Sequence, residues 1–124
     1  MNTDTIKKYL SAVLNDWDKT KNDPFVETTF KTIAHWNIIL LIGQSTYTQH
    51  KISYESLCQQ ISHRIASRAT IQRIINELIT INYVEKNISQ TDQRTKYLVL
   101  TEVGKKEFTK FVQDEIVIFK EIFK

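Results

Sequence analysis

The sequence has little of several residue types that particular classes of protein need. It contains one cysteine, Cys58, which cannot form a disulfide within the chain, and no charged leader followed by an apolar run opens it. We therefore expect a reducing, cytoplasmic compartment. The longest apolar run, Ile38 to Ile42, is far shorter than the roughly 20 residues that a membrane-spanning helix requires. We expect no membrane partner.

Glycine and proline are also scarce, with two glycines and one proline among 124 residues. Gly-rich phosphate loops and multi-stranded barrels need more turn-forming residues than this. The composition therefore predicts a mainly helical fold. A chain of this length supports one domain and buries roughly 65 to 70% of its unfolded surface, which is enough for an ordinary core without metals or disulfides.

Signatures of catalysis and of metal binding are missing as well. The three histidines, at positions 35, 50 and 63, lack the paired spacing of zinc ligands. The sequence shows no nucleophile signature, no carboxylate pair with a reason to differ in pKa and no phosphate loop. We therefore expect no enzyme activity, no metal site and no cofactor.

Apolar residues that recur at intervals of three and four predict amphipathic helices in the first third of the chain. A first helix is expected from near Thr3 to Lys19. A second should begin at Asp23-Pro24, where aspartate caps free N–H groups and proline tolerates the first helical position, and should end at Gly43. The polar segment from Ser45 to Lys51 lacks periodicity and is predicted to be a loop.

The rest of the chain predicts helix, turn, helix, hairpin and helix. A short helix from a Ser53 cap to Ile61 precedes a longer one that starts near Ser67, a candidate cap. The longer helix is expected to bury a stripe made of Ile71, Ile74, Ile75, Leu78 and Ile79. Tyr83–Ile88 and Lys96–Leu100 are runs of strand-forming residues around a polar tip, which is typical of a two-stranded wing. A last helix, capped by Thr101, should reach the final residue, Lys124.

The first and last helices carry more apolar surface than so small a domain covers. Phe108, Phe111 and Phe119 contribute to a wide apolar face on the last helix, and a second subunit is its natural cover. We therefore predict one winged-helix domain over 1–124, mainly α with a two-stranded β wing. Dimerisation helices at about 1–22 and 102–124 would flank a core at about 25–101 and form a homodimer.

Positive charge is concentrated in the middle of the chain. The formal net charge of +3 falls entirely on residues 51–101, and all four arginines lie between positions 64 and 94. The exposed side of the helix that starts near Ser67 is nearly free of acids, since Glu77 is the only acid between Gln59 and Val84. The planar fork of arginine suits phosphates and guanine edges, so this distribution favours an anionic partner.

A spaced motif in the wing points to a family. Asp92-Gln93-Arg94 is followed after five residues by Leu100-Thr101 and after two more by Gly104. This pattern resembles the wing signature of MarR-type (multiple antibiotic resistance regulator) winged helix-turn-helix transcription regulators. Thr70-Ile71-Gln72-Arg73 resembles the recognition helix of that family, and the resemblance covers about residues 25–110. The resemblance implies a homodimer that represses transcription. Its core at about 25–101 would bind a palindromic site on double-stranded DNA.

The residue types suggest which part of the DNA each side chain would contact. Asp92 would hold the guanidinium of Arg94 in one orientation, ready for a narrow A·T-rich minor groove. Gln72 suits adenine, and Arg73 suits guanine or phosphate. Gly104, in the first turn of a helix, indicates close backbone packing. The predicted DNA contacts are Arg64, Ser67, Arg68, Thr70, Gln72, Arg73, Asn76, Asp92, Arg94 and Lys96.

An alternative stays open at this point. The same winged fold could be a protein-interaction module without DNA binding, with its aromatic last helix as the contact surface. A small-molecule effector is possible for a regulator of this kind, but the sequence does not identify one.

Overall fold

The structure is a computed structural model that describes residues 1–88 and 94–123. The chain divides into two compact units. The helical unit consists of Met1–Thr28 and the chain from Glu107 onward, and the winged unit is Thr29–Lys106.

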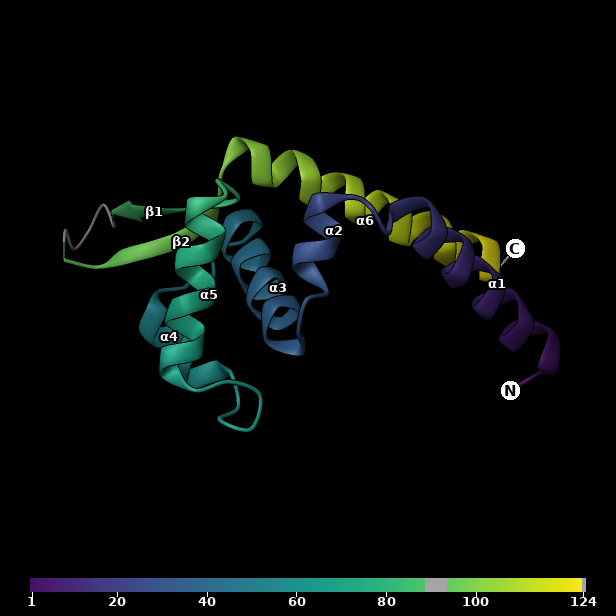
Figure 1. Cartoon of the computed structure of the whole chain (residues 1–124), viewed down its shortest axis with the longest axis horizontal. Coiled ribbons are helices and arrows are strands. Elements are labelled where there is room, and N and C mark those ends of the chain that lie inside the picture. The colour runs from purple at the N-terminus through teal and green to yellow at the C-terminus, as the bar shows by residue number, and fades with distance from the viewer. Residues whose placement is uncertain (89–93, 124) are drawn as a thin grey trace. The chain divides into compact units, whose positions relative to one another are not determined.

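The elements follow the predicted order of helices and a single hairpin (Figure 1). They are α1 (Thr3–Thr20), α2 (Pro24–Thr29), α3 (Ile33–Tyr47), α4 (Tyr54–Gln60), α5 (Arg68–Thr80), β1 (Val84–Ile88), β2 (Lys96–Leu100) and α6 (Glu102–Ile122). The predicted fold, mainly α with a two-stranded wing, is confirmed. The predicted caps at Ser53 and Ser67 are confirmed too, since each side chain accepts a backbone N–H of the first turn that follows.

The prediction of one long second helix is wrong. The structure has two helices there, because the backbone at Thr32 is extended (φ −146°, ψ 166°) and the Thr32 hydroxyl accepts the His35 N–H at 3.1 Å. This new cap restarts the helix. Nor does the helix stop at Gly43, which is buried inside α3. Glycine in a helix costs about 1 kcal/mol relative to alanine, which is less than the gain from burying a side chain such as Ile42 next to it.

The loop predicted from Ser45 onward is also wrong in its first part, because α3 continues to Tyr47. Ser45 is fully buried, and its hydroxyl accepts the N–H of Ile52 at 2.9 Å. The Thr46 hydroxyl accepts the N–H of Leu100 at 2.9 Å. In the sequence these polar residues are typical of a loop. In the structure their hydroxyl groups form hydrogen bonds that connect the end of α3 to backbone N–H groups of later segments.

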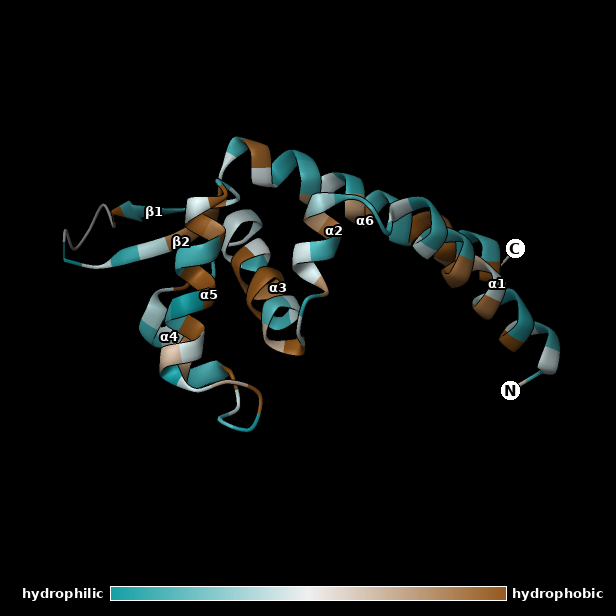
Figure 2. Cartoon of the chain, viewed as in Figure 1, coloured by the Kyte–Doolittle hydropathy of each residue, from teal (hydrophilic) through white to brown (hydrophobic). Residues whose placement is uncertain are grey.

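The core of the winged unit lies among α3, α4, α5 and the hairpin. The antiparallel strands pair with Val84 opposite Leu100 and Ile88 opposite Lys96, and Leu98 forms one further bridge with Ile52. Figure 2 shows the apolar stripes of α3 and α5. The large side chains that are fully buried in this unit are Ile38, Ile39, Ile42, Leu57, Ile61, Ile71, Ile74, Ile75, Leu78, Leu98 and Leu100. The predicted stripe of α5 is therefore confirmed, except for the half-buried Ile79.

Gly104 lies where the start of α6 passes the start of the wing. A Cβ atom at this position would overlap the carbonyl oxygen of Tyr83. The Thr101 hydroxyl accepts the Gly104 N–H at 2.9 Å and donates to the carbonyl oxygen of Asn82 at 2.6 Å. The predicted cap at Thr101 and the predicted packing role of Gly104 are both confirmed.

The helical unit leaves much apolar surface exposed. No residue of the 18-residue helix α1 is buried, and Leu14 and Trp17 are 65% and 51% exposed. In α6, Phe111, Ile118 and Ile122 are buried, but other apolar side chains are not. The exposed ones in this unit are Val112, Ile116, Val117 and Phe119 of α6, and Phe123, which directly follows the helix. Among the described helices, none combines the length and the apolar character that a membrane span needs.

Candidate nucleic-acid interface

A groove of about 480 Å³ in the winged unit is lined by the start of α4, by α5 and by the hairpin. Its lining consists of Ser53, Tyr54, Glu55, Gln72, Lys86, Arg94, Thr95, Lys96 and Leu98. Three cations from the hairpin therefore line the same groove as the Gln72 side chain of α5. Such a surface offers charge to a polyanion and an amide to base edges.

The exposed face of α5 carries paired amides. The Gln72 side-chain NH₂ donates to the side-chain oxygen of Asn76 at 3.0 Å, one helical turn away. Arg73 is exposed between them. At the start of the helix, the Ser67 hydroxyl accepts the Thr70 N–H at 3.2 Å and donates to the Thr70 hydroxyl at 3.1 Å. Together with Arg68, the first residue of α5, the structure thus brings six of the predicted contacts onto one helix with its cap.

The one acid of α5 is neutralised by neighbours from the start of α3. Glu77 accepts hydrogen bonds from Lys31 Nζ at 3.1 Å and from His35 Nε2 at 3.2 Å. Partial burial would raise the pKa of Glu77, but the hydrogen bonds from His35 and Lys31 outweigh burial, so the pKa lies below its usual value. His35 is buried, and its Nδ1 is hydrogen-bonded to the Thr32 hydroxyl at 2.7 Å. Glu77 therefore adds little repulsion toward an anion.

Arg68 is held by α4. Its Nη2 donates to both carboxylate oxygens of Glu55, at 2.8 and 2.6 Å. The Tyr54 hydroxyl donates to the backbone carbonyl of Arg68 at 3.0 Å, and the Tyr54 ring centroid lies 5.9 Å from the guanidinium carbon. The sequence offers no signal for this pairing, because the partners are 13 residues apart and lie on different helices.

The remaining predicted contacts have different surroundings. Arg94 and Lys96 line the groove. Arg64 is exposed in the turn between α4 and α5, where its N–H donates to the Ser62 hydroxyl at 3.2 Å, and it is not part of the groove lining. Asp92 lies outside the described residues. Lys86 was missed in the sequence, although a cation in the first wing strand is a signal that could have found it.

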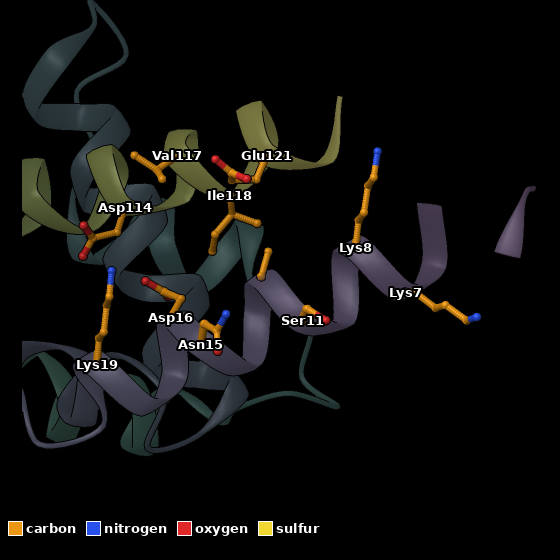
Figure 3. Close-up of a pocket in the computed structure, with 11 residues that line it drawn as sticks. Lys7, Lys8, Ser11, Asn15, Asp16, Lys19, Asp114, Val117, Ile118 and Glu121 are labelled. Atoms are coloured by element: carbon orange, nitrogen blue, oxygen red, sulfur yellow. The ribbon is translucent and has the colours of Figure 1, made fainter. Parts of the chain in front are cut away.

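A second pocket, of about 700 Å³, lies between α1 and α6 within the helical unit (Figure 3). Asp16 and Lys19 of α1 lie beside Asp114 of α6 in its wall. Burial and then the charge of Asp114 raise the pKa of Asp16, while Lys19 acts in the opposite direction. Because the lining carries both signs of charge, this pocket does not indicate the charge of a ligand.

Several solved structures share this arrangement of helices and wing. The transcriptional regulator PA4135 matches with a TM-score of 0.56 and 19% identity, over 94% of this chain and 74% of that one. MarR matches with a TM-score of 0.52 and 16% identity, over 92% of this chain and 80% of that one. Streptococcus pneumoniae FabT, solved in complex with DNA, matches with a TM-score of 0.50 and 20% identity, over 94% of this chain and 82% of that one.

The chain has the MarR winged-helix fold. No protein-family model matches it, and no curated protein matches it in sequence. Within this MarR fold, α4 and α5 are the helix-turn-helix and β1 and β2 are the wing, as the sequence predicted. Of these structural neighbours, PA4135 is described as a transcriptional regulator, and the FabT structure is described as a complex with DNA.

Proposed function

We propose that this protein binds double-stranded DNA sequence-specifically and represses transcription, without enzyme activity. The observation that carries the proposal is the groove in which Gln72 of α5 faces the hairpin cations Lys86, Arg94 and Lys96. Phosphate contacts position a protein on the duplex, whereas contacts to base edges specify the sequence. The groove offers both kinds of contact on adjacent elements.

The face of α5 supports base recognition. The Gln72 and Asn76 amides can each pair with adenine through one donor and one acceptor, and Arg73 can pair with guanine. Their mutual hydrogen bond keeps the two amides on one face until a base edge replaces it. The ion pairs of Glu77 with Lys31 and His35 offset the only negative charge of the helix.

We also propose that the protein acts as a homodimer. An amphipathic helix with no buried residue is marginal by itself, and its stability in proteins comes mostly from packing. A second copy would cover the apolar faces of α1 and α6. Two-fold symmetry would then place two recognition helices on inverted half-sites about one helical turn apart, so the binding site would be palindromic.

The exposed aromatic side chains of α6 favour one other candidate. Phe119 and Phe123 are 59% and 76% exposed, and large exposed apolar patches mark protein–protein contacts. A protein-interaction module would use them to bind a different protein and would leave DNA unbound. Mixing the protein with nonspecific duplex at low salt separates the candidates, because only a DNA-binding protein should bind there.

Selection of bound duplexes from a random pool tests the proposal directly. The expected outcome is an enriched palindrome, bound with an affinity that falls steeply with salt. Arg94→Ala should weaken binding to it by roughly tenfold and lower the salt slope by about one. Lys106→Ala removes an exposed cation outside the groove lining and is the control. A pool without enrichment, together with a flat salt response, would exclude the proposed function.

A further inference from the structure

Among the residues that the structure describes, Glu55 is the one acid in the lining of the cationic groove. It stands in the first turn of α4, and Arg68 is the first residue of α5. The two side chains are 62% and 51% exposed, although they are joined by the short hydrogen bonds from Nη2. Exposed ion pairs contribute little to folding stability, so stability does not account for a carboxylate in a groove that suits a polyanion.

The hydrogen bonds to Glu55 hold the Arg68 guanidinium in one orientation and leave several of its N–H donors available. Arg68 makes both of its side-chain hydrogen bonds among the described residues through Nη2, and none through Nε or Nη1. The Tyr54 ring beside the guanidinium and the Tyr54 hydroxyl bond to the Arg68 carbonyl hold the residue further. Since a guanidinium has five N–H donors, the remaining ones can bind a second anion while Glu55 keeps its own bonds.

A fixed cation and a flexible cation distinguish duplexes differently. A flexible arginine reaches a phosphate in almost any docking position, so it strengthens binding to every sequence alike. A fixed one meets a phosphate only when the protein is docked in one register, and there it has already lost its rotamer freedom. Fixing an arginine therefore widens the difference between specific and nonspecific affinity.

We infer that Glu55 is a positioning residue that determines specificity, because it holds Arg68 so that the guanidinium binds a duplex phosphate only in the specifically docked complex. The inference rests on the proposed DNA-binding function. It assigns Glu55 and Tyr54 of α4 a role in recognition, although the sequence pattern gave a role only to the arginine.

The test uses the full chain, the selected duplex and a scrambled duplex of the same length and composition. Arg68→Ala should weaken binding to the selected duplex by roughly tenfold and lower its salt slope by about one. Glu55→Gln should lower the ratio of specific to nonspecific affinity by roughly tenfold, because the freed guanidinium then binds the scrambled duplex as well. The salt slope on the scrambled duplex should rise by about one.

Two further variants separate positioning from the loss of a negative charge. In the Arg68→Ala background, Glu55→Gln should leave the affinity ratio unchanged, since it acts through the arginine. Glu85→Gln removes an exposed acid that is not part of the groove lining and should leave the ratio unchanged. Thermal unfolding should show that all variants remain folded.

The inference is overturned if Glu55→Gln leaves the ratio unchanged, or if it lowers the ratio equally with and without Arg68. It is also overturned if Arg68→Ala binds the selected duplex as tightly as the unaltered chain does. Failure of the selection itself would instead exclude the proposed function, so the two failures are distinguishable.

Discussion

Replacing Gly104 with alanine should destabilise the winged unit, although alanine is the better helix former. The added Cβ would lie 3.0 Å from the carbonyl carbon of Tyr83 and closer still to its oxygen. That carbonyl accepts the Thr101 N–H at 3.0 Å, so it cannot turn away without losing a backbone hydrogen bond. The Thr101 hydroxyl, which caps α6, would be 3.3 Å from the same Cβ.

The expected size of the effect follows from three contributions. Overpacking a tight site costs about 1 to 3 kcal/mol. Strain or loss of the Thr101 hydrogen bonds adds about 1 to 2 kcal/mol, whereas the helix propensity of alanine returns about 1 kcal/mol. Gly104→Ala should therefore lower the free energy of unfolding by about 1 to 4 kcal/mol, with the middle of the range at about 2.5 kcal/mol. For a chain of this size, the melting temperature should fall by about 10 °C.

Urea unfolding followed by far-UV circular dichroism measures this change. Lys106→Ala, an exposed substitution in the same helix, should change the free energy of unfolding by less than about 0.5 kcal/mol. A Gly104→Ala protein that is as stable as the unaltered chain, or more stable by the propensity gain, would show that α6 does not pass Tyr83 this closely.

Further expectations concern the helical unit and the response to pH. Leu14→Lys, on the exposed apolar stripe of α1, should convert a dimer into monomers in analytical ultracentrifugation, whereas Asn15→Lys on the opposite side of the helix should not; a monomeric unaltered chain would contradict the dimer. Burial and neighbouring carboxylates raise the pKa of Asp16 and Glu115, so the helical unit should gain stability as the pH falls from neutral through these raised values. The pKa of Glu77 is lowered, so its contribution is present at neutral pH and should be lost as the pH falls through that lowered value. Thermal unfolding at pH 7 tests the sign of each contribution to stability. Asp16→Asn should raise the melting temperature, and Glu77→Gln should lower it.

The acid-poor face of α5 shows what can be predicted about a binding surface from composition alone. The scarcity of acids identifies a helix suited to an anionic partner. In that helix Arg73 and Asn76 are exposed as expected, and Gln72 is half-buried. Composition alone does not explain why Glu77 is tolerated there. Its partners Lys31 and His35 come from a segment more than 40 residues earlier, and only the packing of α3 against α5 brings them to it.

Elements that arise from local interactions could be predicted from the amino-acid order. The caps at Ser53, Ser67 and Thr101 and the apolar stripe of α5 depend on neighbours within a few residues, and the two wing strands pair across a single hairpin. All of them were predicted correctly, apart from the half-buried Ile79. Gly104 was also recognised as a packing residue, although the sequence did not name Tyr83 as its neighbour.

Tertiary structure decided the features that depend on distant partners. It divided the expected second helix at Thr32, and it extended α3 past Gly43 because Ser45 and Thr46 find backbone partners far along the chain. It also joined Glu55 to Arg68. Capping and periodicity act over a single helical turn, whereas buried hydroxyls and ion pairs between helices form only after the chain has folded; for that reason the groove could not be assembled from the sequence alone.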